Sequence, residues 1–174
     1  MTFTERYVHT GDVALNVAEW PAPSAGAQLL MLVHGYGSNW HTWGRVTDGL
    51  AKVFHLHAVD LRGMGRSGRV GRSLRRQVWA DDLALLLGEL SDRPAVLGGH
   101  SLGGWVVAAV AAQHPELVAK AVLVEPYSGA RSEVHRQERA RRQAHRERRA
   151  ELIRSADNTG GPAFGCQRAI RRGF

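Results

Sequence analysis

The sequence of 174 residues contains a single cysteine, Cys166, so it has neither an internal disulfide framework nor a cysteine metal cluster. Its longest apolar stretch, Val106–Ala112, is far shorter than the roughly 20 residues of a membrane-spanning helix. The first ten residues carry Glu5 and Arg6 and lack the apolar segment of a secretory signal. These absences predict a cytoplasmic protein without membrane insertion.

The positive charge is confined to one part of the chain. Residues 1–130 hold 11 basic and 11 acidic residues, whereas residues 131–174 hold 12 basic and 5 acidic residues and so carry the whole formal charge of +7. We therefore expect two parts, a globular core over residues 1–128 and an Arg-rich helical segment over residues 129–174.

Apolar runs of strand length alternate with segments of helical spacing. The expected strands are Tyr7–His9, Val13–Trp20, Leu29–Val33, His55–Val59, Ala95–Gly98 and Ala121–Val124. The expected helices are Trp40–Val53, Leu74–Leu90 and Leu102–Gln113. Strands alternating with helices predict an α/β fold, with a mostly parallel sheet, flanking helices and an antiparallel hairpin at its start.

The strongest chemical signal is G-x-S-x-G at residues 99–103, between a buried strand and a helix. A serine in such a sharp turn is lifted above the sheet, because the flanking glycines let the neighbouring backbone approach closely. The N-terminus of the helix that begins at Leu102 would lie where an oxyanion develops. The alternative is an ordinary glycine-rich turn, but the strand before and the helix after favour Ser101 as a nucleophile.

Two further glycine motifs follow earlier strands. His34–Gly37 reads H-G-Y-G, and the Tyr36 N–H could join the Leu102 N–H as a two-donor oxyanion hole; the alternative is a plain turn. In the second motif, Gly63, Gly65 and Gly68 satisfy the G-x-G-x-x-G fingerprint of dinucleotide-binding proteins. Its glycines do not open a helix directly, which disfavours that interpretation.

Three motifs together resemble the α/β-hydrolase superfamily, over about residues 5–127. They are H-G-Y-G at residues 34–37, D-L-R-G-M-G-R-S-G at residues 60–68 and G-H-S-L-G-G at residues 99–104. The similarity is to its esterase, lipase, epoxide-hydrolase-like and C–C-hydrolase-like members. It implies that Ser101 is the nucleophile, that Tyr36 and Leu102 supply backbone oxyanion donors, and that residues 60–68 form a structural loop. Related epoxide hydrolases carry Asp at the nucleophile position, so serine implies acyl or related carbonyl chemistry.

A serine nucleophile needs a base and usually a carboxylate, in the family order Ser, Asp or Glu, then His. Glu125 follows the strand after the nucleophile helix and is the candidate acid; alternatively it is a structural carboxylate. Only His114, His135 and His145 follow Ser101, and none follows a later strand. We therefore expect a chain that lacks the C-terminal strands of the fold.

The Arg-rich segment has two interpretations: a partial helical cap, or a tail from an altered reading frame. Nucleic-acid binding is disfavoured, because glutamates interleave with the arginines and stacking aromatics are missing. The sequence gives no indication of an oligomeric state.

These observations predict a hydrolase that acts on a small-molecule ester or similar carbonyl compound through a serine acyl-enzyme, with no metal and no organic cofactor. The alternative is a catalytically inactive hydrolase-fold fragment or interaction protein. A dinucleotide-binding protein is the third possibility.

Overall fold

The computed structural model describes residues 2–69 and 75–127, together with Glu147. The predictions for the Arg-rich segment 129–174, including His135 and His145, lie outside these described residues. The strands are β1 (Thr4–Thr10), β2 (Val13–Trp20), β3 (Leu29–Val33), β4 (His55–Val59), β5 (Ala95–His100) and β6 (Val118–Val124). The helices are η1 (Trp40–Trp43), α1 (Gly44–Leu50), α2 (Arg76–Leu90), α3 (Leu102–Gln113) and η2 (Pro115–Leu117).

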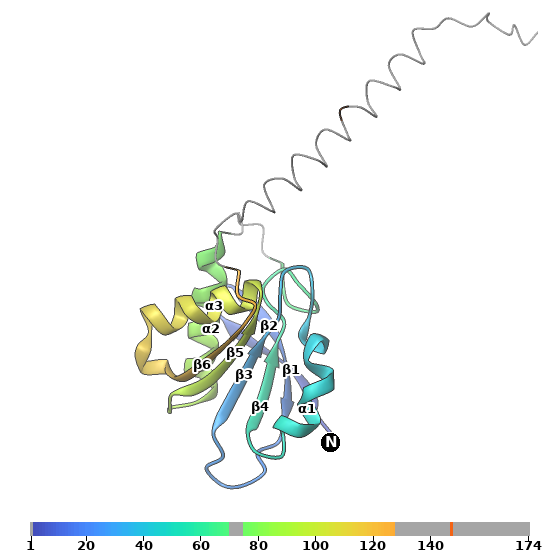
Figure 1. Ribbon diagram of the computed structural model, residues 1–174, viewed down its shortest axis with the longest axis vertical. Helices are drawn as coiled ribbons and strands as arrows, with labels where there is room; N and C mark the ends of the chain where they lie inside the picture. The colour runs from blue at the N-terminus through green and yellow to red at the C-terminus, as the bar shows by residue number, and fades with distance from the viewer. Residues whose placement is uncertain (1, 70–74, 128–146, 148–174) are drawn as a thin grey trace, which may run out of the picture. The chain divides into compact units, whose positions relative to one another are not determined.

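One six-stranded sheet has the order β1-β2-β4-β3-β5-β6. The hairpin β1–β2 pairs antiparallel and joins β4 antiparallel, whereas β4, β3, β5 and β6 run parallel. Helices α2 and α3 cover one face of this sheet and α1 covers the other (Figure 1). The predicted α/β fold with a mostly parallel sheet and flanking helices is confirmed.

Each face of the sheet has its own hydrophobic core. The larger core packs alternate residues of the strands against α2 and α3, and the smaller one packs the other face against η1 and α1. Strand β3 contributes to both cores, which explains why all five of its residues are buried and why its sequence does not alternate.

Strands β1, β5 and β6 extend beyond their expected bounds. The alternation of Val13, Leu15 and Val17 is typical of a half-buried strand, but β2 is buried on both faces, because Ala18 joins the smaller core and Asn16 donates a hydrogen bond to Asp60.

The helix expected over residues 40–53 is divided into η1 and α1. Its spacing places Trp43, Val46 and Leu50 on one side, but Val46 is 45% exposed. Thr47 and Ala51 are buried instead.

The loop of residues 60–68 is fixed by buried hydrogen bonds. Oδ1 of Asp60 accepts the Trp40 N–H at 2.7 Å, and Oδ2 accepts the Arg66 N–H at 2.9 Å. Arg62 donates two hydrogen bonds to Asp82 of α2, at 2.6 and 2.7 Å. These bonds raise the pKa of the Arg62 guanidinium, although its burial acts in the opposite direction. The loop therefore ties β4 to η1 and to α2, as a structural loop should.

Strand β6 forms one edge of the described sheet. Its apolar side chains Val122, Leu123 and Val124 are between 41% and 55% exposed. Such side chains normally lie on strands that other elements cover, and within residues 2–69 and 75–127 nothing covers them. No helix in this described part combines the length and hydrophobicity needed to cross a bilayer.

The tight fit of Gly65 against Asp60 gives a first testable prediction. Gly65 has φ +53°, and a Cβ there would overlap the Asp60 carboxylate. We expect Gly65→Ala to lower the free energy of unfolding by about 2–4 kcal/mol, through backbone strain and loss of the buried hydrogen bonds. Chemical denaturation measures this change.

Gly88 of α2 provides the matched control, because its added Cβ would meet nothing within 4 Å. Gly88→Ala should raise the free energy of unfolding by about 0.5–1 kcal/mol, as expected for an exposed helical glycine. Equal effects of the two substitutions would contradict a specific Gly65–Asp60 packing constraint.

Candidate active site

Ser101 occupies the sharp turn between β5 and α3. Its backbone has φ +51° and ψ −112°, a conformation that costs a non-glycine residue about 1–3 kcal/mol. The Ser101 N–H donates to the Val124 carbonyl at 3.1 Å, and the Ser101 carbonyl accepts the Tyr127 N–H at 2.8 Å. The end of β6 thus holds the strained turn in place from both sides.

Glycines let three stretches of backbone meet at this turn. A Cβ on Gly99 would overlap the backbone of Gly103, and a Cβ on Gly103 would overlap the carbonyl of Val33. A Cβ on Gly104 would lie 2.9 Å from Cβ of Pro126. Helix α3 therefore starts directly against the ends of β3 and β6, which is the close approach that the G-x-S-x-G motif predicts.

The loop of residues 34–37 lies beside the serine. A Cβ on Gly35 would be 3.3 Å from Cβ of Ser101 and 3.1 Å from Nδ1 of His100. Gly37 has φ +70°, which lets the loop turn sharply after Tyr36. The Tyr36 side chain is 77% exposed, so the backbone of this residue, and not its ring, is the part that the loop positions.

His34 is a structural member of the site. Its Nδ1 donates to the Gly35 carbonyl at 2.7 Å, and its Nε2 accepts the Leu61 N–H at 3.0 Å, an assignment that follows from the partners. Burial lowers the pKa of His34, so the ring is neutral near pH 7. Since both ring nitrogens are occupied, His34 holds the loop after β3 against the loop after β4.

Leu102 is the first residue of α3 and is buried. Its N–H belongs to the first turn, where amides have no partner within the helix, so it is available to an acceptor beside Ser101. The first turn of α3 and the loop that contains Gly35 and Tyr36 therefore both lie beside Ser101. Backbone N–H groups that converge beside a nucleophile stabilise a developing oxyanion, which stays the prediction for Leu102 and Tyr36.

Glu125 directly follows β6, and its backbone lies beside the Ser101 turn, because Val124 and Tyr127 on either side of it both hydrogen-bond to Ser101. It has φ +42°, an uncommon conformation for a residue other than glycine, and its side chain is exposed. Within residues 2–69 and 75–127, its carboxylate makes no hydrogen bond or ion pair with a histidine. The structure therefore places Glu125 close to Ser101 at the carboxyl ends of β5 and β6, but no hydrogen bond joins the two side chains.

No hydrogen bond joins Ser101 to a histidine in the described part of the chain. His100 ends β5 and packs beside Gly35, whereas His114 lies at the far end of α3, where its Nδ1 is 3.4 Å from Glu116. Within residues 2–69 and 75–127, Ser101 thus lies beside the first turn of α3, the loop of residues 34–37 and the backbone of Glu125, without a hydrogen bond to an imidazole.

The glycines of residues 63–68 do not form a phosphate-binding turn. Gly63 and Gly65 have positive φ, and the loop closes on itself through the Gly63 N–H and the Gly68 carbonyl. Gly65 faces the Asp60 carboxylate, which already accepts the Arg66 N–H. Because a buried carboxylate fills the space that a phosphate would need, this geometry disfavours dinucleotide binding.

A pocket of about 240 Å³ lies between the start of η1 and the loop after β4, lined by Asn39, Trp40, His41, Asp60, Gly65 and Arg66. It opens at the carboxyl ends of the parallel strands, the edge at which ligands bind in open α/β sheets. Ser101 follows β5 at the same edge.

A polar cluster that the sequence motifs do not indicate is formed by Glu19, His55 and His57. The two histidines alternate along β4, so they share a face of the sheet, and Glu19 pairs with His57 in the register of β2 and β4. The H-x-H pattern was visible in the sequence. The glutamate opposite it was not, since the pairing register follows only from the fold.

Comparison with known proteins bears on this site. Residues 28–159 match the family model described as alpha/beta hydrolase fold. The chain is 39% identical over 110 residues to the pimeloyl-[acyl-carrier protein] methyl ester esterase of Klebsiella pneumoniae (strain 342), covering 63% of this chain and 41% of that protein. The chain therefore spans about two fifths of the length of this curated relative.

Solved structures give the same picture. The thioesterase domain from the curacin biosynthetic pathway superposes with a TM-score of 0.67 at 26% identity, over 72% of this chain and 47% of that one. E-2-(acetamidomethylene)succinate hydrolase superposes with a TM-score of 0.63 at 34% identity, over 69% of this chain and 43% of that one.

The strained turn generates a prediction about stability. Ala at position 101 keeps the steric cost of φ +51°, whereas Gly removes it, and both remove the hydroxyl. We expect Ser101→Gly to have a free energy of unfolding about 1 kcal/mol higher than Ser101→Ala, measured by denaturant titration. A Ser101→Ala protein at least as stable as Ser101→Gly would show that the turn stores no strain.

Buried His34 predicts a pH dependence of stability. Its folded pKa lies below the unfolded value of 6.5, so the unfolded state binds the proton first as the pH falls. The contribution of His34 to the free energy of unfolding should therefore be maintained above pH 6.5 and should fall by up to about 1.4 kcal/mol between pH 7.5 and 5.5.

The control is His34→Asn, whose free energy of unfolding should change less over this pH range. Some slope remains, because burial also lowers the pKa of His57 to about 4. An unchanged slope in the variant would contradict the assignment to His34.

Proposed function

The chain belongs to the α/β-hydrolase fold family, and from this premise we propose that it hydrolyses a small ester or related carbonyl compound through an acyl-enzyme on Ser101. The observation that carries the proposal is the Ser101 elbow: a strained serine at the start of α3, with Gly35 against its Cβ. Strain of this kind persists only where the surrounding structure imposes it, and it is common at catalytic residues.

The proposed reaction has two steps. Oγ of Ser101 attacks the substrate carbonyl as a base takes its proton, and the carbonyl oxygen becomes an oxyanion that accepts hydrogen bonds from the Leu102 and Tyr36 amides. The leaving group departs with a proton, which gives the acyl-enzyme. Water then attacks the acyl carbon and releases the carboxylic acid and free Ser101. We propose Glu125 as the carboxylate that orients the base.

The substrate class follows from the chemistry and from the relatives. Similar proteins are named a methyl ester esterase, a thioesterase domain and a substituted succinate hydrolase. The proposal is therefore hydrolysis of an oxygen ester or thioester, with the acyl part as the recognised portion. The oxyanion site and nucleophile require neither a metal nor an organic cofactor.

A second candidate function is a hydrolase-fold core that binds ligands or partners without turnover. The observation that favours it is that Ser101 has no histidine partner in residues 2–69 and 75–127. A serine hydroxyl without a base is a weak nucleophile, although oxyanion donors alone still accelerate acyl transfer to some extent. Covalent labelling and turnover, measured on the same variants, separate the two functions.

The first functional prediction concerns Ser101→Ala. The full chain should react with a fluorophosphonate probe and hydrolyse p-nitrophenyl butyrate, and the substitution should abolish labelling and lower kcat/KM at least 1,000-fold. Ser24→Ala is the matched control, because Ser24 is an exposed loop residue, and it should leave both signals unchanged. Wild-type chain without a Ser101-dependent adduct would refute the proposed catalysis and support the non-catalytic core.

The second functional prediction concerns the acid. Glu125→Gln should lower kcat on p-nitrophenyl butyrate at least about 100-fold with little change in KM, because the amide cannot stabilise an imidazolium. Glu116→Gln removes an exposed carboxylate in η2, before the opposite end of β6, and should leave kcat within twofold of wild type. If the two variants behave alike, Glu125 is a structural residue.

A further inference from the structure

Glu19, His55 and His57 form a polar cluster across two paired strands, which we call the Glu-His-His cluster. Nε2 of His55 lies 2.8 Å from Oε1 of Glu19, and Nε2 of His57 lies 3.5 Å from the same oxygen. One potential ligand atom from each residue lies within 4.8 Å of the others. Two imidazoles therefore converge on one carboxylate oxygen.

His57 is the unexplained member of this cluster. Its side chain is 1% exposed, and within residues 2–69 and 75–127 neither ring nitrogen makes a hydrogen bond of acceptable geometry. A buried polar atom without a partner costs about 1–3 kcal/mol, so such atoms usually have a ligand or a water as partner. The imidazole of His57 lies beside His55, with ring centroids 4.3 Å apart. Its Nε2 therefore faces a space that already contains a carboxylate oxygen and a second imidazole.

We propose that the Glu-His-His cluster binds a divalent transition-metal ion of the zinc type. Imidazole and carboxylate are preferred zinc ligands at about 2.0–2.2 Å, and tetrahedral coordination at this length separates ligand atoms by about 3.4 Å. The separations of 2.8 and 3.5 Å from Oε1 of Glu19 lie on either side of that value. Small side-chain rotations bring three ligands into place, and the fourth position is left to water.

The charged neighbours are compatible with an ion. Arg6 donates from Nε to Oε2 of Glu19 at 2.8 Å, so it engages the carboxylate oxygen that the histidines do not. Although burial opposes it, the hydrogen bonds from Arg6 and His55 hold the pKa of Glu19 below its usual value. The carboxylate is therefore ionised at neutral pH. Oε1 remains the oxygen directed at the two imidazoles.

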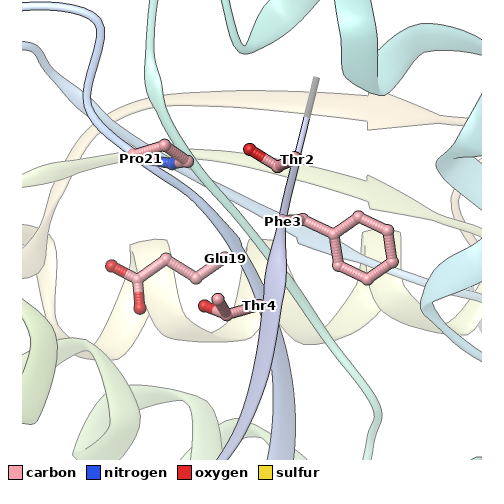
Figure 2. A pocket seen from close by; sticks show the side chains of 5 residues that line it. All are labelled: Thr2, Phe3, Thr4, Glu19 and Pro21. Carbon is pink, nitrogen blue, oxygen red and sulfur yellow. The ribbon is translucent and has the colours of Figure 1, made fainter.

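The cluster is reached from solvent beside the start of the chain. Side chains of Glu19 and His55 are 24% and 28% exposed. Glu19 also lines a pocket of about 260 Å³ together with Thr2, Phe3, Thr4 and Pro21. Figure 2 shows the Glu19 carboxylate pointing away from the Phe3 ring, on the side of Thr4. An ion thus has a path that does not cross the core.

This site is separate from the Ser101 elbow. His55 pairs with Leu29 at the start of β3, whereas Ser101 follows the end of β5, so the two sites lie at opposite ends of the parallel strands. A metal here would cross-link β2 to β4 and so fix the amino-terminal hairpin to the parallel strands. Its expected effect is on stability, because an ion that binds only the folded state shifts unfolding by mass action.

The test is titration of the full chain with zinc chloride, with affinity measured by competition against a zinc-binding dye. We expect Glu19→Gln and His55→Gln each to weaken zinc affinity at least tenfold, because each removes one ligand. Zinc at 100 times its Kd should raise the unfolding midpoint of the wild type by about 5–10 °C and that of the variants much less. Cobalt bound in its place should show the visible absorption of tetrahedral coordination in the wild type.

His114→Gln is the matched control, because His114 also faces a carboxylate, that of Glu116, but within residues 2–69 and 75–127 no third metal-ligating side chain joins them. It should leave zinc affinity within twofold of wild type. Both ligand variants alter partly exposed side chains and are checked for folding by circular dichroism, so either one carries the test alone. Affinity that is the same in wild type, Glu19→Gln and His55→Gln would place zinc on other histidines or on Cys166 and overturn the proposal.

Discussion

The candidate active site depends on a close approach of backbones that only glycine permits. Gly103 places the first turn of α3 against the carbonyl of Val33, and Gly99 leaves room for the backbone of Gly103 itself. Since no side chain separates these segments, the start of α3 has a single available position. That position forces Ser101 into its strained conformation and sets its Cβ against Gly35. Packing at three glycines therefore determines how the first turn of α3 and the loop of residues 34–37 lie relative to the serine.

A second constraint is the set of buried polar groups behind this site. Asp60 accepts backbone N–H groups from Trp40 and Arg66, and His34 accepts the one from Leu61. The bonds from Trp40 to Asp60 and from Leu61 to His34 join segments 20 and 27 residues apart, whereas the bond from Arg66 closes the loop after β4 on Asp60. Breaking any of them would leave a buried acceptor with one partner fewer. The loops after β3 and β4 are consequently as fixed as the strands. Preorganised backbone donors are useful in catalysis only if their loops do not reorganise during the reaction.

The sequence was sufficient for the parts of the fold that local patterns determine. The bounds of β3, β4 and α3 agree with those predicted, because each is an apolar run or a helical period that ends at a polar residue. The burial of Asn16 could not be predicted, since its partner Asp60 is 44 residues away. The G-x-S-x-G motif predicts the sharp turn at Ser101. The exposure of Glu125 depends instead on the position of β6 at the edge of the described sheet. Sequence patterns specify elements, whereas side-chain environments depend on contacts between distant segments.

The same reasoning explains why local sequence patterns do not predict the Glu-His-His cluster. A strand that is covered on both faces normally excludes polar residues, so two histidines in β4 are a departure from the pattern rather than part of it. His55 is accounted for by its bond to Glu19, but His57 gains no such bond to offset its burial. A buried imidazole without a partner in the chain is tolerated in one of two cases. Either a ligand binds to it, or the folded state is less stable because of it. The first case leaves a ligand-dependent signature and the second does not, so the two can be distinguished by stability alone.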